Sequence, residues 1–304
     1  MRRRAGLVGL ALAAGLQAGG DTAAAQDSPP AALQAPAPAP EIAAATELAT
    51  AMAGRATVLL GEIHDNPRHH RLRLEALRLR LAAGWRPALV MEQFDRERQP
   101  DLDRARLEQP GSADHVIAAA TAGVRASWLW AEYRPFVQLA LDYDLPLLAG
   151  NVSRADLARI RKEGPGAVLG PELVAALGLD RPIPGDIVTA LEKEIDRGHC
   201  YRAPPDLLPG LARSQAIRDA WMAHLLRRHA AAVVLLAGNG HVRRDYGVPR
   251  WLPPGRGADL IAVGLLEAGQ AELPAAAFDR VFTTPPAPRP DPCAAFATPP
   301  GGGR

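Results

Sequence analysis

Four continuous apolar runs constrain the fold of this chain more than any other feature. They cover residues 57–62, 88–92, 145–151 and 232–241, and a fifth run covers residues 260–266. In the first four runs apolar residues follow one another instead of alternating with polar ones, which indicates strands that are buried on both faces. Residues 279–282 are compatible with a short edge strand.

Helical patterns fill most of the sequence between these runs. Pro67 opens a helix that Gly84 closes, with proline at the start and glycine at the end as helices prefer. Long helical patterns between buried strands predict crossover connections and a parallel sheet. The helical stretch from about 153 to 229 is too long for one crossover, and we expect it to form a cap. The predicted fold is therefore an α/β domain over residues 47–284, with a mainly parallel central sheet flanked by helices.

Polar side chains follow each of the first four predicted strands. The first strand leads to Glu62 and His64, the second to Glu92, the third to Asn151 and Arg154, and the fourth to Asn239 and His241. In open parallel sheets ligands bind outside the carboxyl ends of the strands, so we expect these side chains to share one pocket. The glycines at 61 and 238, each three residues before a histidine, permit a sharp turn and close approach to a ligand.

Glu62, His64, Glu92 and His241 are the candidates for chemistry in this pocket. Two imidazoles and two carboxylates could bind a divalent metal such as Mn, Co or Zn. The same groups could act as acid and base without a metal, since histidine titrates near neutral pH. In a third interpretation they only hydrogen-bond one another and hold the loops.

Other polar residues lie close to the first motif. His69 and His70 point in different directions on a helix, so only one of them is expected to face the site, and we select His70. Asp65 or Asn66 is expected to cap the helix that begins at Pro67.

Two further groups have two interpretations each. Arg218 lies near Gln215 and Asp219 on one helix face, which either braces the pocket or faces solvent. The aromatic patch from Trp128 to Arg134, which includes Tyr133, could flank a flat ligand or belong to the core.

The two ends of the chain differ from this domain in composition. Residues 1–25 combine three arginines, an apolar segment and a small-residue cleavage site, which is typical of a secretory signal peptide. A Pro- and Ala-rich linker follows over residues 26–46, and a Pro- and Gly-rich tail covers residues 285–304. Loss of the signal would take the formal charge of +2 to about zero, which argues against a nucleic-acid partner. We expect a soluble periplasmic protein, exported by the general or the twin-arginine route.

Cys200 and Cys293 are the only cysteines of the chain. In an oxidising compartment they could form a disulfide that ties the tail to the body, which we favour over two free thiols. Their spacing excludes a zinc ribbon and a covalent c-type haem site.

Several of these motifs resemble those of one known family. Residues 61–70, Met91–Glu92, 198–200, 214–223 and 238–241 are similar to the ChaN-like haem-binding uptake family, which forms a superfamily with the Tiki and TraB proteins. The resemblance spans about residues 55–270. It implies an α/β body and haem bound non-covalently, with a homodimer that shares the haem as one arrangement. It also implies an iron-regulated role in haem uptake beside outer-membrane uptake components.

The resemblance implies two sets of site residues. The family's haem ligand is a tyrosine, for which we select Tyr201 in the predicted cap, with Tyr133 as another candidate. Further candidates for contact with haem are His70, Asn151, Arg154, Asn239 and Arg218. The Tiki relatives are similar to metal-dependent proteases, which implies a metal-dependent hydrolase as the alternative function. In that case Glu62, His64, Glu92 and His241 would surround the metal.

Overall fold

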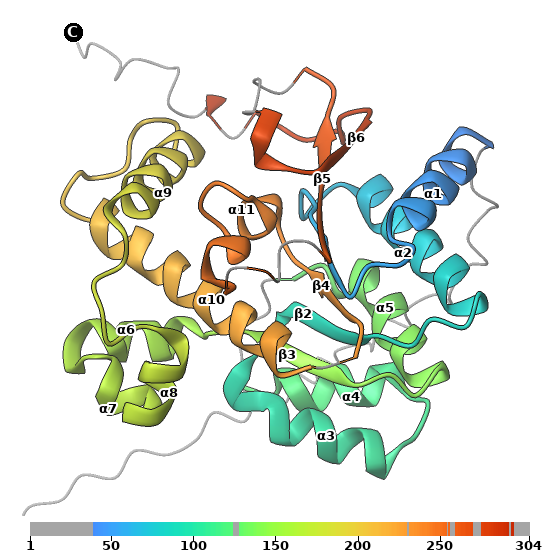
Figure 1. The fold of residues 1–304 in the computed structure, drawn as a ribbon, viewed down its shortest axis with the longest axis horizontal. Coiled ribbons are helices and arrows are strands. Elements are labelled where there is room, and N and C mark those ends of the chain that lie inside the picture. Colours follow the sequence, from blue (N-terminus) through green and yellow to red (C-terminus); the bar gives the residue numbers. More distant parts are fainter. Residues whose placement is uncertain are drawn as a thin grey trace, which may run out of the picture. The chain divides into compact units, whose positions relative to one another are not determined.

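In the computed structural model, which describes residues 39–123, 128–229, 231–253, 255, 259–269, 275–291 and 293–294, six strands form a single sheet. The strands are β1 (Thr57–Leu60), β2 (Ala88–Asp95), β3 (Leu147–Asn151), β4 (Val233–Leu236), β5 (Leu260–Glu267) and β6 (Arg280–Thr284). Their order across the sheet is β3-β2-β4-β1-β5-β6, and every neighbouring pair is parallel (Figure 1). The predicted α/β fold with a parallel sheet is confirmed. The predicted signal peptide lies outside the described residues.

Helices connect the strands over most of the described chain. They are α1 (Ala39–Ala51), α2 (Pro67–Ala82), α3 (Gln99–Glu108), α4 (Ala113–Thr121), α5 (Trp130–Asp142), α6 (Arg154–Glu163), α7 (Pro165–Leu169), α8 (Pro171–Leu177), α9 (Gly185–Gly198), α10 (Leu208–Arg228) and α11 (Asn239–Val242). Single 3₁₀ turns occur at η1 (Arg96–Arg98), η2 (Val248–Trp251) and η3 (Ala275–Ala277).

The continuous apolar runs are explained by cores on both faces of the sheet. In β1, Val58 and Leu60 pack into the core shared with α1 to α5, whereas Leu59 packs into a second core. That second core includes Met222 and Leu226 of α10. Side chains alternate between the two faces of a strand, so a strand with an apolar core on each face is apolar at every position.

Beyond α10, on the side away from the sheet, lie the helices α6 to α9 (Figure 1). Two small apolar clusters fasten them to α10, one around Ile187 and Leu191 of α9 and the other around Leu157 and Ile160 of α6. The stretch from 153 to 229 is therefore mostly helical. Its last helix, α10, packs directly on the sheet, and only α6 to α9 stand apart from it.

Two predicted boundaries were wrong. The Pro- and Ala-rich linker was predicted to reach residue 46, but α1 begins at Ala39, because alanine favours helix and Ala45 and Leu48 are buried in the core shared with α2. The fourth apolar run was predicted as one strand to residue 241, but β4 ends at Leu236 and His241 lies in the single turn of α11.

Among the helices that the structure describes, none combines the length and the hydrophobicity that a membrane span requires.

Candidate functional site

Parallel pairing brings the ends of β1, β2 and β4 to one edge of the sheet. Leu236 of β4 is in register with Leu60 of β1 and with Met91 of β2. The residues that follow these three positions therefore emerge side by side. Glu62, Glu92 and the turn at Gly238 meet there, as the position of the apolar runs predicted.

Glu62 lies at the centre of a buried polar cluster. Its side chain is inaccessible to solvent, and it accepts hydrogen bonds from the Tyr133 hydroxyl at 2.6 Å and from His64 Nδ1 at 2.9 Å. It also pairs with the guanidinium of Arg73, which lies fully buried on α2. Burial lowers the pKa of Arg73 to about 10, so the guanidinium stays charged at neutral pH and compensates the carboxylate.

His64 is held by this cluster but reaches solvent. Because its Nδ1 faces Glu62, the second ring nitrogen, Nε2, is directed away from the carboxylate, and the side chain is 46% exposed. The ring contacts Trp128 edge-on at 4.9 Å between centroids. A carboxylate that fixes one imidazole nitrogen sets the tautomer and leaves the other nitrogen available to a ligand.

A second buried row consists of Glu92, His241 and Asp219. His241 Nδ1 lies 2.6 Å from Asp219, and its Nε2 lies 3.4 Å from Glu92. Burial opposes the charge on His241, but the two carboxylates outweigh it and raise the pKa of His241 to about 10. Burial raises the pKa of Asp219 to about 6, whereas His241 holds the pKa of Glu92 well below its usual range. At neutral pH the row is therefore an imidazolium between two carboxylates.

Two glycines make this arrangement sterically feasible. A Cβ at Gly238 would lie 2.9 Å from Cε1 of His64, and one at Gly61 would lie 2.3 Å from the side-chain oxygen of Asn239. Asn239 in turn bonds the backbone of Leu265 on β5 with both ends of its amide, at 2.6 and 3.1 Å. Asn239 therefore braces the sheet edge, a role different from the predicted contact with haem.

In front of these groups lies a cavity of about 850 Å³, which we call the sheet-edge cavity. It is lined by His64, Asp65, Glu92, Gln93, Asp95, Glu97, Ala120, Thr121, Gly123, Trp128, Leu129, Trp130, Asn151, Ser153, Arg154, Ala155, Gln215 and Arg218. Five of the predicted site residues are therefore on its wall: His64, Glu92, Asn151, Arg154 and Arg218. Glu62 and His241 lie behind that wall, where they hold His64 and Glu92.

Neither histidine at the start of α2 reaches the cavity. His70 is buried, with Nε2 2.9 Å from the backbone oxygen of His64 and Nδ1 3.2 Å from Arg73, and burial lowers its pKa. His69 receives the backbone N–H of Ile63 and contacts Thr284 of β6. His70 thus faces the Glu62 cluster, with Nδ1 3.1 Å from the carboxylate, but neither ring reaches the cavity, and both hold the loop after β1. Asn66 caps α2 by accepting the N–H of Arg68, as expected.

Tyr201 lies outside the sheet-edge cavity, in the loop of residues 199–207 that follows α9, here called the Tyr201 loop. Tyr201 is 69% exposed, whereas Tyr133 and Tyr246 are buried and Tyr143 is half-buried. Cys200 and Tyr201 both have a left-handed backbone, with φ of 58° and 56°. The structure thus separates the predicted haem contacts into two groups, in the cavity and in this loop.

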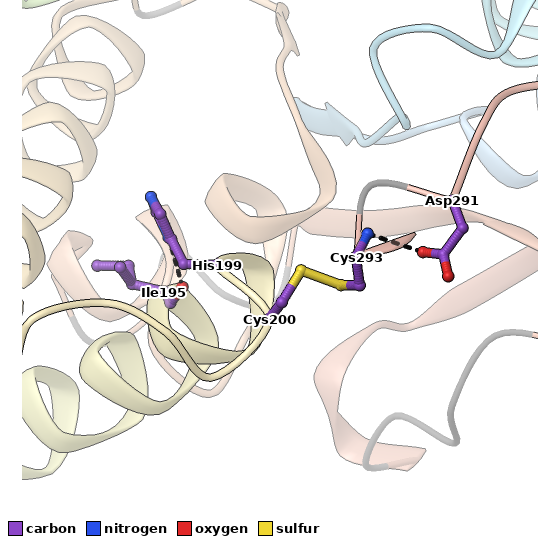
Figure 2. The surroundings of a disulfide bond; sticks show 5 residues. All are labelled: Ile195, His199, Cys200, Asp291 and Cys293. Carbon is purple, nitrogen blue, oxygen red and sulfur yellow. Dashed lines mark hydrogen bonds between the residues drawn. A yellow bond between two sulfur atoms is a disulfide. The ribbon is translucent and has the colours of Figure 1, made fainter. Parts of the chain in front are cut away.

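The predicted disulfide joins Cys200 of this loop to Cys293 of the tail (Figure 2). Beside it, His199 Nδ1 lies 2.7 Å from the backbone oxygen of Ile195, and the N–H of Cys293 donates to Asp291 (Figure 2). Upstream in the tail, Arg289 pairs with Asp65 and Glu267. The tail therefore fastens both the Tyr201 loop and the loop after β1.

Sequence reasoning missed two residues of the site. Arg73 is fully buried as the partner of Glu62; its signal was a charged residue three positions after His70 and four before Leu77, on the buried face of α2. Gln93 is 4% exposed and lines the cavity, but an amide that follows a glutamate in an apolar run gave no distinct signal.

Within the described ranges, no three His, Cys, Asp or Glu side chains are arranged to hold a metal ion.

Comparison with known proteins identifies relatives of this chain. The protein family described as "Haem-binding uptake, Tiki superfamily, ChaN" matches residues 48–252. The solved structure of ChaN of Campylobacter jejuni, described as showing cofacial haem binding, has a TM-score of 0.61 and 20% identity. The match covers 78% of this chain and 90% of that chain, and it supports the same fold.

Two more distant structures also match. An erythromycin esterase in its open conformation has a TM-score of 0.44 and 15% identity, over 77% of this chain and 76% of that chain. A Bacillus cereus protein has a TM-score of 0.38 and 12% identity, over 74% of this chain and 69% of that chain. A search of curated protein sequences found no match.

Proposed function

Because this chain belongs to the ChaN family of haem-binding uptake proteins in the Tiki superfamily, we propose that it binds haem non-covalently through Tyr201. The observation that carries this proposal is the exposure of Tyr201. It is the one tyrosine of the four that is mostly exposed, at 69%. A phenolate is a suitable ligand for ferric haem, which supplies an iron centre that accepts an oxygen donor.

The Tyr201 loop is fixed in a way that suits a ligand residue. The disulfide anchors Cys200, and the N–H of Tyr201 donates to the backbone oxygen of Asp196 at 2.8 Å. A side chain held on a fixed backbone loses less entropy on binding than one on a free loop. Leu207, at the end of the loop, is 52% exposed and offers apolar surface nearby in the sequence.

We further propose a homodimer that forms with haem. One exposed phenol occupies one face of the haem and leaves the other face without a protein ligand. The ChaN of Campylobacter jejuni is described with cofacial haem, in which haem faces lie against each other. In the same arrangement here, each subunit would hold one haem on Tyr201, and the partner's haem would cover the free face.

The sheet-edge cavity suits haem less well than the Tyr201 loop does. It has no tyrosine on its wall, so it offers no phenolate to the haem iron. Tyr133, the other predicted tyrosine, is buried, and its hydroxyl is committed to Glu62.

The alternative of a metal-dependent hydrolase does not fit the donor set at the sheet edge. Both ring nitrogens of His241 face carboxylates, so this histidine has no lone pair to offer at neutral pH. Glu62 is inaccessible to solvent and is already compensated by Arg73. A metal ion would have to displace both sets of partners.

We infer that the protein works in the periplasm, in haem and iron uptake beside outer-membrane uptake components. The disulfide supports an oxidising compartment, since disulfides persist in the periplasm and are rare in the cytosol. The signal-like residues 1–25 support export.

Titration of the purified protein with hemin tests the haem site. We expect a saturable shift of the Soret band with the absorption pattern of a ferric phenolate complex. Tyr201→Phe should weaken hemin binding roughly tenfold or more and abolish that pattern. Tyr143→Phe, which changes a half-buried tyrosine under Arg86, should bind hemin like the wild type. Equal hemin binding by the two variants would refute the role of Tyr201.

A further inference from the structure

We propose that the sheet-edge cavity is a second ligand site, independent of haem, for a small organic carboxylate that carries an amide group and an apolar ring. Nothing in the haem proposal uses this cavity. Its wall divides into an anion-binding end, an unpartnered amide and an aromatic side, and each part recognises one portion of such a ligand.

The anion-binding end lies at the start of α6. Ser153, Arg154 and Ala155 line the cavity, so the first turn of this ten-residue helix faces it. The Ser153 hydroxyl accepts only the N–H of Asp156, and the first N–H groups of a helix have no partner within the helix. Helix N-termini attract anions through these N–H groups and through the helix dipole.

Two guanidinium groups strengthen this end. Arg154 makes no ion pair with any described residue, and its side chain is exposed. Arg218 of α10 is held by Asn151 at 2.9 Å and by Gln215 at 2.5 Å, through Nε and Nη1. Burial lowers the pKa of Arg218; the nearby carboxylates of Glu92 and Asp95 oppose this, and the charge of Arg154 adds to it. A carboxylate bound between the two arginines would relieve their mutual repulsion and accept paired hydrogen bonds.

Gln93 is the second, independent sign of a ligand. It is only 4% exposed and lines the cavity, yet neither the nitrogen nor the oxygen of its amide has a hydrogen-bond partner among the described residues. The neighbouring Tyr133 hydroxyl donates to Glu62 at 2.6 Å, so its proton is not available to the Gln93 amide oxygen. An unpartnered buried amide is costly, by about 1–3 kcal/mol in general. Both amide atoms of Gln93 are buried just behind the wall, and a turn of this side chain into the cavity would let a ligand amide satisfy both its ends.

The aromatic side and the volume fit the remainder of the ligand. Trp128 and Trp130 lie on the wall, and Trp128 also contacts His64. Indole rings bind flat apolar groups by stacking or edge contacts. A volume of about 850 Å³ is within the usual range for sites that bind small molecules.

The acidic residues of the wall do not turn the cavity into a cation site. Glu92 is paired with His241 and Asp65 with Arg289. Asp95 lies near Arg218 and accepts a hydrogen bond from Asn151 at 2.7 Å. Glu97 is the one carboxylate of the wall with neither an ion pair nor a side-chain hydrogen bond among the described residues, so a cationic ligand would meet a single uncompensated carboxylate and would be repelled by Arg154. A carboxylate ligand would meet Arg154 and the helix N-terminus directly.

Calorimetric titration of the full chain with a matched pair of probes tests the proposal. N-acetyl-L-phenylalanine carries a carboxylate, an amide and a ring, and N-acetyl-L-phenylalaninamide differs only in lacking the charge. We expect the carboxylate to bind about tenfold more tightly, which corresponds to about 1.4 kcal/mol. Arg154→Met should abolish this preference, and Gln93→Leu should weaken both probes alike. Arg161→Met, at the far end of α6, is the control and should bind like the wild type.

Three results would overturn the proposal: equal affinity for the two probes, no saturable binding of either probe at millimolar concentration, or equal effects of Arg154→Met and Arg161→Met. The haem proposal is tested separately in the same experiment. Tyr201→Phe should leave binding of N-acetyl-L-phenylalanine unchanged, as should saturation of the wild type with hemin. Displacement of the probe by hemin would mean that the cavity is the haem site itself, and the second-site proposal would fail.

Discussion

The sheet-edge cavity and the Tyr201 loop are built by different physical means. The cavity is held by strand register and by buried charges, with Glu62 against Arg73 and His241 between two carboxylates. The Tyr201 loop, as far as the structure describes it, has no such buried charge network and is held by backbone hydrogen bonds and by one covalent bond to the tail. The first kind of site is sensitive to the loss of a charge, and the second to reduction. The comparison therefore predicts which perturbation should damage which region.

The largest effect is expected at the buried charges behind the cavity. Arg73→Met would leave the Glu62 carboxylate buried without its counter-charge, which should destabilise the protein by about 3–5 kcal/mol. Urea denaturation measures the change. Arg71→Met on the same helix, which removes a partly exposed pair with Glu41, should cost less than about 1 kcal/mol. A similar loss in both variants would show that the charge network does not support the cavity.

Reduction should act on the other region. The Cys200–Cys293 bond closes a loop with a sequence separation of 93, and its loss should cost about 2–4 kcal/mol. Reduced protein should also bind hemin more weakly than oxidised protein, because the Tyr201 backbone is released. A Cys200→Ser/Cys293→Ser variant controls for side effects of the reductant and should not respond to it. Unchanged hemin affinity after reduction would show that the loop does not need its anchor.

Dependence of stability on pH should again separate the two regions. The folded-state pKa of His241 is raised from 6.5 to about 10, so its contribution is complete below pH 6.5 and is lost as the pH rises toward 10. We expect the free energy of unfolding to fall by roughly 3 kcal/mol between pH 6.5 and 9. His241→Gln should flatten this slope. A wild-type profile that is flat over this interval would rule out the imidazolium.

A smaller effect is expected where the loop after β1 meets the tail. Asn66 caps α2, and its amide also donates to Glu267 at 2.6 Å and to the backbone oxygen of Pro285 at 3.3 Å. Asn66→Ala should lower the free energy of unfolding by about 1–2 kcal/mol, as measured by thermal unfolding. Asn66→Asp should keep the cap but place a carboxylate beside Glu267. The stability that this variant loses should therefore be smaller at low pH, where protonation removes the repulsion between the two carboxylates. Equal, pH-independent losses in both variants would contradict this role.

The same contrast between the cavity and the Tyr201 loop explains how much of each region could be predicted from the sequence. The sheet and the convergence of Glu62, His64, Glu92 and His241 were predictable, because continuous apolar runs specify buried parallel strands whose ends share one edge. The roles of the individual residues behind the cavity wall could not be predicted. No pattern separates a histidine that holds a loop, such as His70, from one that reaches a cavity, such as His64. Gln93 was missed because the absence of hydrogen-bond partners for its amide is visible only in the structure.

Tyr201 was selected only through the resemblance to a family. Its position depends on an irregular loop, a left-handed backbone and a bond to a residue 93 positions away, none of which has periodicity that a sequence displays. The prediction that the linker reaches residue 46, where the structure has α1, was wrong for a simpler reason. Prolines before residue 41 concealed an alanine-rich helix whose buried side, at Ala45 and Leu48, has few large residues.

The most direct test of separate sites is to locate the iron in crystals of the protein soaked with hemin. The anomalous scattering of iron marks its position without reference to a model of the haem. We expect the anomalous peak within bonding distance of the Tyr201 hydroxyl, with the sheet-edge cavity free of iron. A peak inside the cavity beside His64 would contradict the division of the molecule into a haem-binding loop and an independent pocket.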